Sequence, residues 1–145
     1  QGPPRTKETL ILSEEVVNKM RQALTRVVTE GTARKAQLES FSAAGKTGTS
    51  EKIDPETKSY SANKRLASFI GFAPASNPHL VAYILIDEPK KKPYYGGVWA
   101  APVFKDIMDK SLKYLNIAPD NANNALKINL SKKVDQQKND PKSKL

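Results

Sequence analysis

The chain has 145 residues and a formal net charge of +9, with no Cys and a single His, His79. This length corresponds to one domain or to part of a larger one, and no apolar run approaches the roughly 20 residues of a membrane-spanning helix. The composition excludes a disulfide framework, a thiolate zinc site and a multi-His metal site, so we expect neither a metal nor a cofactor.

The basic excess lies in the C-terminal part, where residues 90–145 hold 12 Lys against five Asp. Such an excess is typical of a solvated surface, and it leaves open an attraction to a polyanion. Aromatic residues make up only 7% of the chain, and no basic stripe interleaved with aromatic residues occurs. We therefore expect no nucleic-acid partner.

The first predicted element is an amphipathic helix over residues 14–29. Ser13 is a good N-cap for it, and two acidic residues that suit the positive end of a helix follow. Gly31 is placed to end the helix as its C′ residue, and a second short turn is predicted from Thr32. Met20 is expected to belong to the core. The apolar residues that recur at helical spacing are Val16, Val17, Met20, Ala23, Leu24, Val27 and Val28.

Three extended segments are predicted next. Residues 42–50 are small and punctuated by Gly, which indicates either a strand that approaches other backbone closely or a phosphate-binding loop. Residues 51–64 are polar and rich in turn residues around Asp54, so they are predicted to form a loop or a hairpin arm. Residues 65–73 favour a second strand, and residues 80–86 form a continuous apolar run of seven that predicts a strand covered on both faces.

The last predicted helix spans residues 102–115, with Pro102 at its start, where a missing N–H costs nothing. Residues 119–145 are rich in Asn, Lys, Asp, Gln and Ser and are predicted to be a disordered basic tail, which leaves residues 1–118 as the folded part. The order of helix, three strands and helix predicts an α+β fold, in which the N- and C-terminal helices pack on an antiparallel three-stranded sheet.

The segment that carries chemistry has the sequence Ala-Gly-Lys-Thr-Gly-Thr-Ser. It is a weak match to a P-loop, because the first Gly of that motif would fall at Ser40. As Lys-Thr-Gly-Thr on a strand it suits an acyl-transfer site, with Lys46 placing a positive charge beside a substrate carboxylate. Thr47 and Thr49 then point to the same face, and Gly48 leaves room for an extended substrate. A backbone N–H on such an edge can stabilise a developing oxyanion.

The chain resembles the C-terminal part of the transpeptidase domain of class B penicillin-binding proteins, of the septal, cell-division type. Besides the Lys-Thr-Gly-Thr motif, several groups of residues carry the resemblance, in family order over about residues 10–120. They are residues 27–33, 69–75 with 77–78, 94–97 with 101–104, and 116–120.

The resemblance implies the penicillin-binding-protein and β-lactamase type of transpeptidase fold, and D,D-transpeptidation of peptidoglycan stem peptides by a serine that β-lactams also acylate. It implies that Lys46 is the catalytic lysine of the motif and that the Thr49 N–H is one of two oxyanion-hole donors. It further implies that the hydroxyls of Thr47 and Thr49, on either side of Gly48, bind the terminal carboxylate of the peptide or the drug. The parent protein would have a single membrane anchor, a catalytic domain on the periplasmic side of the cytoplasmic membrane, and membrane proteins of the divisome as partners.

The other two motifs of the family, Ser-x-x-Lys and Ser-x-Asn, precede Lys-Thr-Gly, and nothing in residues 1–45 matches either one. The segment Ser61-Ala62-Asn63-Lys64 matches both patterns but lies downstream of the motif, so we do not expect Ser61 to be the nucleophile. We therefore expect an inactive fragment of a serine-type enzyme, whose partner is the missing upstream part of the same domain. Apolar surface is expected to stay uncovered until another chain or copy packs on it.

Two further expectations concern the aromatic residues and the basic region. Tyr94, Tyr95 and Trp99 are expected either to line the mouth of the site or to pack the last helix onto the sheet, while His79 is expected at the surface. The alternative function is a non-catalytic module that binds a polyanion through residues 90–145.

Overall fold

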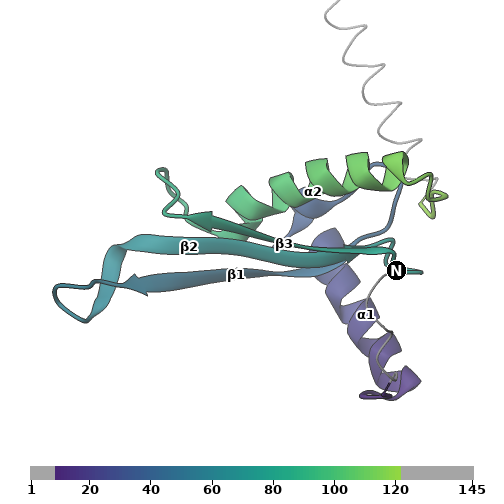
Figure 1. The fold of residues 1–145 in the computed structure, drawn as a ribbon, viewed down its shortest axis with the longest axis horizontal. Coiled ribbons are helices and arrows are strands. Elements are labelled where there is room, and N and C mark those ends of the chain that lie inside the picture. The colour runs from purple at the N-terminus through teal and green to yellow at the C-terminus, as the bar shows by residue number, and fades with distance from the viewer. Residues whose placement is uncertain (1–8, 122–145) are drawn as a thin grey trace, which may run out of the picture.

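The computed structural model describes residues 9–121, so most of the predicted basic tail, residues 122–145, lies outside the described residues. The described part has the predicted order of one helix, three strands and one helix, with a short 3-10 turn after the first helix (Figure 1). The elements are α1 Glu14–Thr29, the turn Arg34–Ala36, β1 Ala44–Ile53, β2 Tyr60–Ala73, β3 Leu80–Asp87 and α2 Gly96–Tyr114.

The three strands form one antiparallel sheet in the order β1-β2-β3, which confirms the predicted α+β architecture. In the register, Thr47 lies opposite Phe69, and Phe69 lies opposite Ile84. The helices lie on opposite sides of this sheet, with α2 along one face and α1 crossing below the other (Figure 1). The segment 44–49 is therefore part of a strand, which rules out the phosphate-loop interpretation, because a P-loop leaves its strand and enters a helix.

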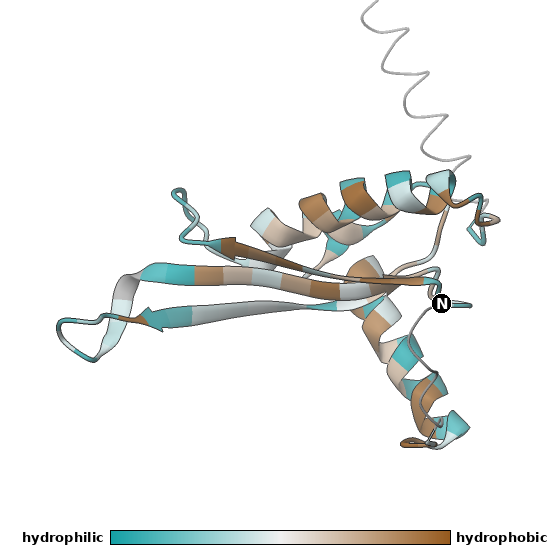
Figure 2. Ribbon diagram, in the orientation of Figure 1, coloured by the Kyte–Doolittle hydropathy of each residue, from teal (hydrophilic) through white to brown (hydrophobic). Residues whose placement is uncertain are grey.

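The core lies between α2 and the sheet. The rings of Phe69 and Phe104 meet edge to face with their centroids 4.7 Å apart, and Met108 and Leu112 continue the buried face of α2. The apolar side chains of β3 that face α2 are partly buried against this cluster, and β3 also shows the strongest hydrophobic colouring of the sheet (Figure 2).

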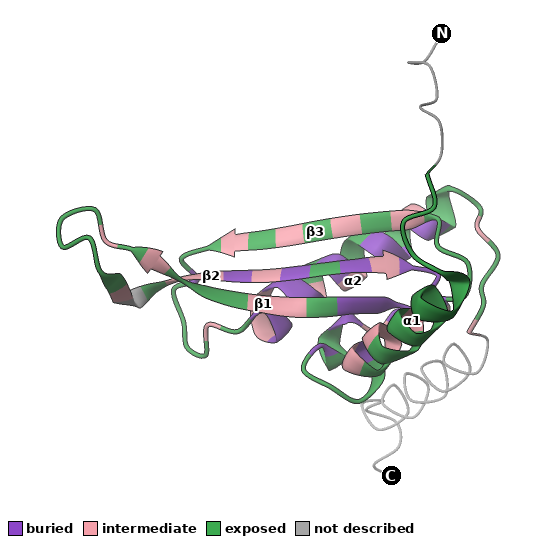
Figure 3. Cartoon of the chain, turned by 90° about the horizontal axis from the view of Figure 1, so that it is seen from below, coloured by how far each residue is buried: buried purple, intermediate pink, exposed green. Residues whose placement is uncertain are grey.

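The prediction that the apolar run 80–86 is covered on both faces is wrong for the described chain. Burial alternates along β3 (Figure 3), and Val81, Tyr83 and Leu85 are 71%, 59% and 47% exposed. The physical reason is the placement of α1, which packs against β1 and leaves this face of β3 open. The uncovered apolar surface that the sequence predicted is thus present.

The bounds and the N-cap of α1 agree with the sequence prediction, and the Ser13 hydroxyl accepts a hydrogen bond from Val16 N at 3.4 Å. Met20, predicted to be buried, is 51% exposed, because the first half of α1 extends past the sheet. Gly31 follows the C-cap without adopting the left-handed conformation expected of a C′ glycine. Its role is steric instead, because a Cβ there would lie 2.9 Å from the carbonyl oxygen of Val27.

Helix α2 begins at Gly96, six residues before the predicted start at residue 102, and Pro102 lies inside the helix. Gly96 and Gly97 are its first two residues. A Cβ on Gly96 would lie 2.0 Å from the carbonyl oxygen of Ser68. The first turn of α2 can therefore pack this closely against the sheet only if residue 96 is glycine.

Asp120 joins the end of the described chain to the segment just before β1. Its carboxylate accepts hydrogen bonds from Ser42 N at 2.6 Å, from the Ser42 hydroxyl and from the Ser76 hydroxyl at 2.5 Å. Partial burial raises the pKa of Asp120, but the hydrogen bonds from Ser42 and Ser76 outweigh it and hold the pKa below its usual value. The predicted tail therefore begins with residues that contact the domain.

Replacing Phe104 with Ala should lower the free energy of unfolding by about 3–5 kcal/mol, because it removes a fully buried ring and leaves a cavity against Phe69. Urea unfolding followed by circular dichroism measures this loss. Ile107→Ala, on the exposed side of the same helix, is the matched control and should change stability by less than about 1 kcal/mol. Equal losses for the two variants would contradict the placement of the core.

Asp120→Asn should lower the free energy of unfolding by about 1 kcal/mol near neutral pH, because the largely exposed carboxylate accepts three hydrogen bonds. A carboxylate with a lowered folded-state pKa stabilises the fold above its unfolded pKa of about 3.9 and loses that effect as the pH falls through the folded value. The difference between wild type and variant should therefore shrink as the pH falls from about 5 to about 2. A difference that stays constant over this range would contradict the assignment.

Candidate functional site

The Lys-Thr-Gly-Thr motif lies on β1, at an edge of the described sheet. Because side chains alternate along a strand, Thr47 and Thr49 face the side that carries α2, together with Phe69, which lies opposite Thr47. Lys46 faces the other side, opposite Ile70. The prediction that the two threonine hydroxyls share one face is confirmed.

Three hydrogen bonds position the polar groups of the motif. The hydroxyls of Thr32 and Thr47 lie 3.0 Å apart, and the Thr49 hydroxyl accepts from Gly96 N at 3.3 Å. The Lys46 ammonium donates to the carbonyl oxygen of Thr47 at 3.0 Å. The first turn of α2 and the segment after α1 therefore hold the two threonines from different directions.

The bond from Lys46 to the Thr47 carbonyl also indicates which backbone groups face outward. In an antiparallel pair, alternate residues direct both backbone groups either into the ladder or away from it. Since the Thr47 carbonyl accepts from a side chain, we place it on the open side of β1. Thr49, two residues further on, then directs its N–H to the same open side, where it can donate to a bound molecule.

A cavity of about 500 Å³ opens beside the two threonines. Its walls come from the segment after α1, from β1 and from the first turn of α2. The side chains of Thr32, Arg34, Lys35 and Tyr95 contribute to the lining, and Gly96 and Gly97 bring backbone to its surface. The cavity joins a basic wall to two hydroxyls, a combination that suits a carboxylate or another anion.

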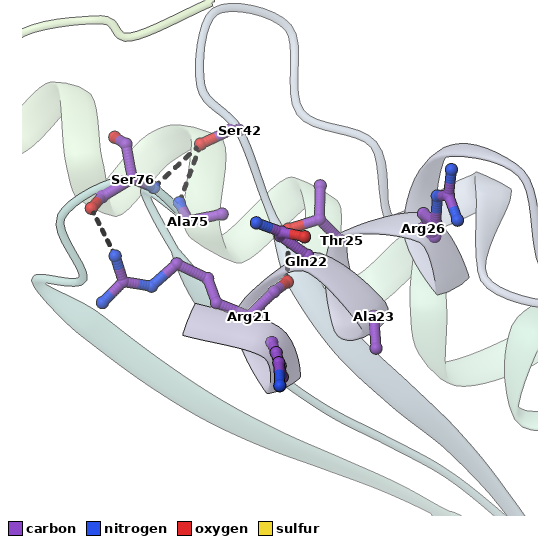
Figure 4. A pocket seen from close by; sticks show the side chains of 9 residues that line it. Arg21, Gln22, Ala23, Thr25, Arg26, Ser42, Ala75 and Ser76 are labelled. Carbon is purple, nitrogen blue, oxygen red and sulfur yellow. Dashed lines mark hydrogen bonds between the residues drawn. The ribbon is translucent and has the colours of Figure 1, made fainter. Parts of the chain in front are cut away.

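A second hollow, of about 650 Å³, lies between α1 and the loops at Ser42 and Ser76 (Figure 4). Arg21 crosses it and donates to the carbonyl oxygen of Ser76 at 3.1 Å, and the Ser42 hydroxyl accepts from Ala75 N at 2.8 Å. None of the Lys-Thr-Gly-Thr residues lines this hollow, so it is not the site that the motif serves.

Ser61 lies on β2 in the hairpin arm, where its hydroxyl accepts from Lys64 N at 3.2 Å and its carbonyl oxygen from Arg65 at 2.5 Å. Ala67 lies opposite Thr49, six residues from Ser61, so the serine is about 20 Å away along the strand. The family's nucleophile opens a helix, as the resemblance implies, whereas Ser61 lies on a strand. The geometry therefore agrees with the prediction that Ser61 is not the nucleophile.

The aromatic residues named from the sequence separate into different roles. Tyr95 lines the cavity beside Gly96, whereas Tyr94 lines a separate hollow next to Asp87 and Glu88. The Trp99 indole N–H donates to the carbonyl oxygen of Pro93 at 2.9 Å, which ties the first turns of α2 to the preceding loop.

His79, Asp87 and Glu88, none of which lines the cavity, are surface residues. His79 is exposed and lies 3.3 Å from the Asn77 amide nitrogen. Asp87 and Glu88 both pair with Lys52, and their hydrogen bonds raise the pKa of that lysine. Residues 9–121 hold no group of three or more His, Cys, Asp or Glu that is placed to bind a metal ion.

Three lining residues were missed by the sequence reasoning: Thr32, Arg34 and Lys35. Thr32 was interpreted as the start of a helical turn, which in fact spans Arg34–Ala36, and the two basic residues were given no role. Gly48 has a packing role that was also missed, because a Cβ there would lie 2.5 Å from the Ser68 hydroxyl oxygen. These contacts join segments that are distant in the sequence, so they become visible only in the folded structure.

Comparison with known proteins gives a consistent result. A family model described as the penicillin binding protein transpeptidase domain matches residues 2–109. The chain is 43% identical over 119 residues to Stage V sporulation protein D of Bacillus subtilis, and 43% identical over 111 residues to the peptidoglycan D,D-transpeptidase FtsI of Buchnera aphidicola. These matches cover 82% and 76% of this chain but 18% and 19% of the relatives, so the chain spans about a fifth of their length.

Solved structures support the fold. The transpeptidase domain of penicillin-binding protein 3 from Burkholderia pseudomallei is 36% identical and aligns with a TM-score of 0.61 over 69% of this chain and 30% of that one. Penicillin-binding protein 3 from Mycobacterium tuberculosis, solved in complex with ampicillin, is 29% identical and aligns with a TM-score of 0.71 over 82% of this chain and 28% of that one. The described elements are therefore part of a larger known fold.

Gly96→Ala should lower the free energy of unfolding by about 1–3 kcal/mol, because its Cβ would meet rigid backbone at Ser68 and Gly48. This strain outweighs the gain of up to about 1 kcal/mol that alanine brings to a helix. Gly48→Ala is the matched control, because its Cβ would meet only the Ser68 side chain, which can rotate away. Urea unfolding compares them, and a stabilised Gly96→Ala variant would contradict the close approach of α2.

Proposed function

The chain belongs to the penicillin-binding protein transpeptidase domain family, and from this membership we propose that it is the C-terminal part of a peptidoglycan D,D-transpeptidase. The observation that carries the proposal is the Lys46–Thr49 motif on an open strand edge, with two threonine hydroxyls directed into one cavity. Class B penicillin-binding proteins are the family members it resembles, and its relatives include one named for sporulation and one named as a peptidoglycan D,D-transpeptidase.

In the proposed reaction, a serine hydroxyl supplied by the upstream part of the domain attacks the carbonyl carbon between two D-Ala residues. The C–N bond breaks, the terminal D-Ala leaves with the proton, and an ester to the serine remains. An amine from a neighbouring stem peptide then takes the acyl group and restores the serine O–H. Covalent catalysis of this kind divides one difficult step into two easier ones.

The residues of this chain would bind and polarise the peptide. The hydroxyls of Thr47 and Thr49 would hold its terminal carboxylate, since both line the cavity and Gly96 N–H orients the second of them. The Thr49 N–H would donate to the oxyanion, an interaction whose loss typically costs about 3–4 kcal/mol of transition-state stabilisation. The Lys46 ammonium would provide positive charge beside the proton-transfer groups.

The side of the sheet that carries Lys46 supports the proposal of a missing upstream part. Ile70, Val81, Tyr83 and Leu85 lie on this same side and are exposed, whereas α2 closes the opposite side. A segment that covered these apolar residues would also reach Lys46, so burial of apolar surface and completion of the active site would be one event. The chain alone is accordingly proposed to be inactive.

The cellular setting is also a proposal. No helix among residues 9–121 is long and apolar enough to span a membrane. By likeness to the relatives named as a sporulation protein and a peptidoglycan D,D-transpeptidase, the parent protein would act in septal cell-wall cross-linking. From the resemblance to class B penicillin-binding proteins, it would have a membrane anchor upstream, its catalytic domain on the outer side of the cytoplasmic membrane, and divisome proteins as partners.

The alternative, a polyanion-binding module, has less support. In the described part of the basic region, Lys105, Lys110 and Lys113 each pair with a carboxylate, which leaves them less available to a polyanion. Lys90–Lys92 remain exposed, and Lys90 lines a hollow together with Asp87 and Glu88, whose negative charge disfavours a polyanion there.

A labelled penicillin tests the proposed function. The parent protein is the longer protein that we propose contains this chain. It should become covalently labelled, whereas the 145-residue chain alone should not. Ser61→Ala in the parent should leave labelling unchanged, because Ser61 is far along β2 from the motif. Absence of labelling in the parent would overturn the proposal, and labelling of the isolated chain at Ser61 would overturn the assignment of the nucleophile.

Lys46→Ala in the parent should slow acylation by about 10²-fold or more, because it removes the positive charge beside the proton-transfer groups. Lys52→Ala is the matched control on the same strand, where the lysine pairs with Asp87 and Glu88 outside the cavity. Stopped-flow measurement of acylation gives both rates. If the two variants slowed acylation equally, the role assigned to Lys46 would be wrong.

A further inference from the structure

The cavity beside Thr47 and Thr49 has a second basic region that the proposed reaction does not use. Arg34 and Lys35 line it, and no Asp or Glu does. Both belong to the 3-10 turn after α1, two and three residues beyond Thr32, whose hydroxyl lies 3.0 Å from that of Thr47. The two basic side chains are therefore adjacent to the proposed carboxylate site without being part of it.

Arg34 is held in place and still has donors to spare. Its Nε and Nη2 donate to the carbonyl oxygen of Glu30 at 3.1 and 2.8 Å, at the C-terminal end of α1. A guanidinium has five N–H groups, so this helix capping uses two and leaves three without a hydrogen bond to the described residues. Pre-organised donors of this kind suit a planar carboxylate.

Lys35 makes no hydrogen bond or ion pair with the described residues, although it lies against the cavity. Most other lysines of the described helices and strands have a carboxylate partner, as Lys19, Lys52, Lys105, Lys110 and Lys113 do. Capping of α1 accounts for two of the N–H groups of Arg34. It does not account for Lys35, whose charge has no carboxylate partner among the described residues.

Helix α2 adds to the positive potential. Its first residues, Gly96 and Gly97, line the same cavity, and its first turn contains no acidic residue. A Cβ on Gly97 would lie 2.1 Å from the carbonyl oxygen of Thr32, so the helix end lies directly against the turn that carries Arg34. The N-terminal end of a helix carries a partial positive charge, so three independent sources of positive potential meet in one cavity.

We propose that Arg34 and Lys35 form a subsite for a second carboxylate, carried by a residue near the end of the same peptide whose terminal carboxylate binds Thr47 and Thr49. This inference rests on the proposed function and names its substrate class, an acidic stem peptide with two free carboxylates. A peptide whose second carboxylate is amidated would leave the two basic side chains without a partner and would bind less well.

The test uses two synthetic peptides that end in D-Ala-D-Ala and differ only in one side chain near that end, a carboxylate in one and its amide in the other. Release of D-Ala by the parent protein gives kcat/KM for each. Wild type should prefer the acidic peptide by about tenfold, the effect expected of one charge-assisted hydrogen-bonded pair. Arg34→Gln with Lys35→Gln should bring this ratio close to one.

Two further variants separate the subsite from general charge and from misfolding. Lys91→Gln with Lys92→Gln removes the same charge from an exposed segment outside the cavity and should leave the ratio unchanged. Arg34→Lys with Lys35→Arg keeps both charges and should restore most of the preference, while turnover of the amidated peptide shows that each variant is folded.

The outcomes distinguish the subsite from the proposed function itself. A wild-type parent that releases D-Ala from both peptides equally well would overturn the subsite alone. The same holds if the preference survives in the Arg34 and Lys35 double variant, or if it falls equally in the Lys91 and Lys92 double variant. A parent that neither releases D-Ala nor reacts with penicillin would instead overturn the proposed function.

Discussion

The first turn of α2 lies against backbone so closely that no side chain fits between them, and the geometry of the site depends on this approach. A Cβ on Gly96 would lie 2.0 Å from the Ser68 carbonyl oxygen, and one on Gly97 would lie 2.1 Å from that of Thr32. Because the helix reaches so far, the Gly96 N–H contacts the Thr49 hydroxyl and the helix end forms one wall of the cavity. Three segments separated in the sequence thus surround one small volume.

Strand geometry divides the motif between the two sides of the sheet. Lys46 faces the side that lacks a covering layer over β3, and Thr47 and Thr49 face the side that α2 covers. An extended peptide along the open edge of β1 would meet an ammonium on one side and two hydroxyls on the other. This separation suits a reaction in which one group of residues binds the carboxylate and another moves protons.

The sequence was sufficient for the local elements and insufficient for whatever depends on distant contacts. The period of apolar residues and the N-cap at Ser13 predicted α1, and the turn residues around Asp54 predicted the hairpin arm. The start of α2 was misplaced, because Pro102 is a local signal for a helix start whereas the requirement at Gly96 comes from Ser68, in another strand. Likewise, the motif from Lys46 to Thr49 could be identified in the sequence. Arg34 and Lys35 belong to no motif, and only the structure shows that they line the same cavity.

The bond between Ser42 and Asp120 joins residues 78 positions apart and so bears on the order in which this part of the chain folds. Hairpin contacts such as those between β1 and β2 close short loops, whereas this contact closes a loop that contains nearly the whole sheet and α2. During synthesis the strands can pair before Asp120 has been made, but the beginning of β1 is completed only when the last described residues return to it. The contact that secures the N-terminal end of the motif strand therefore cannot form until the segment up to Asp120 has been synthesised.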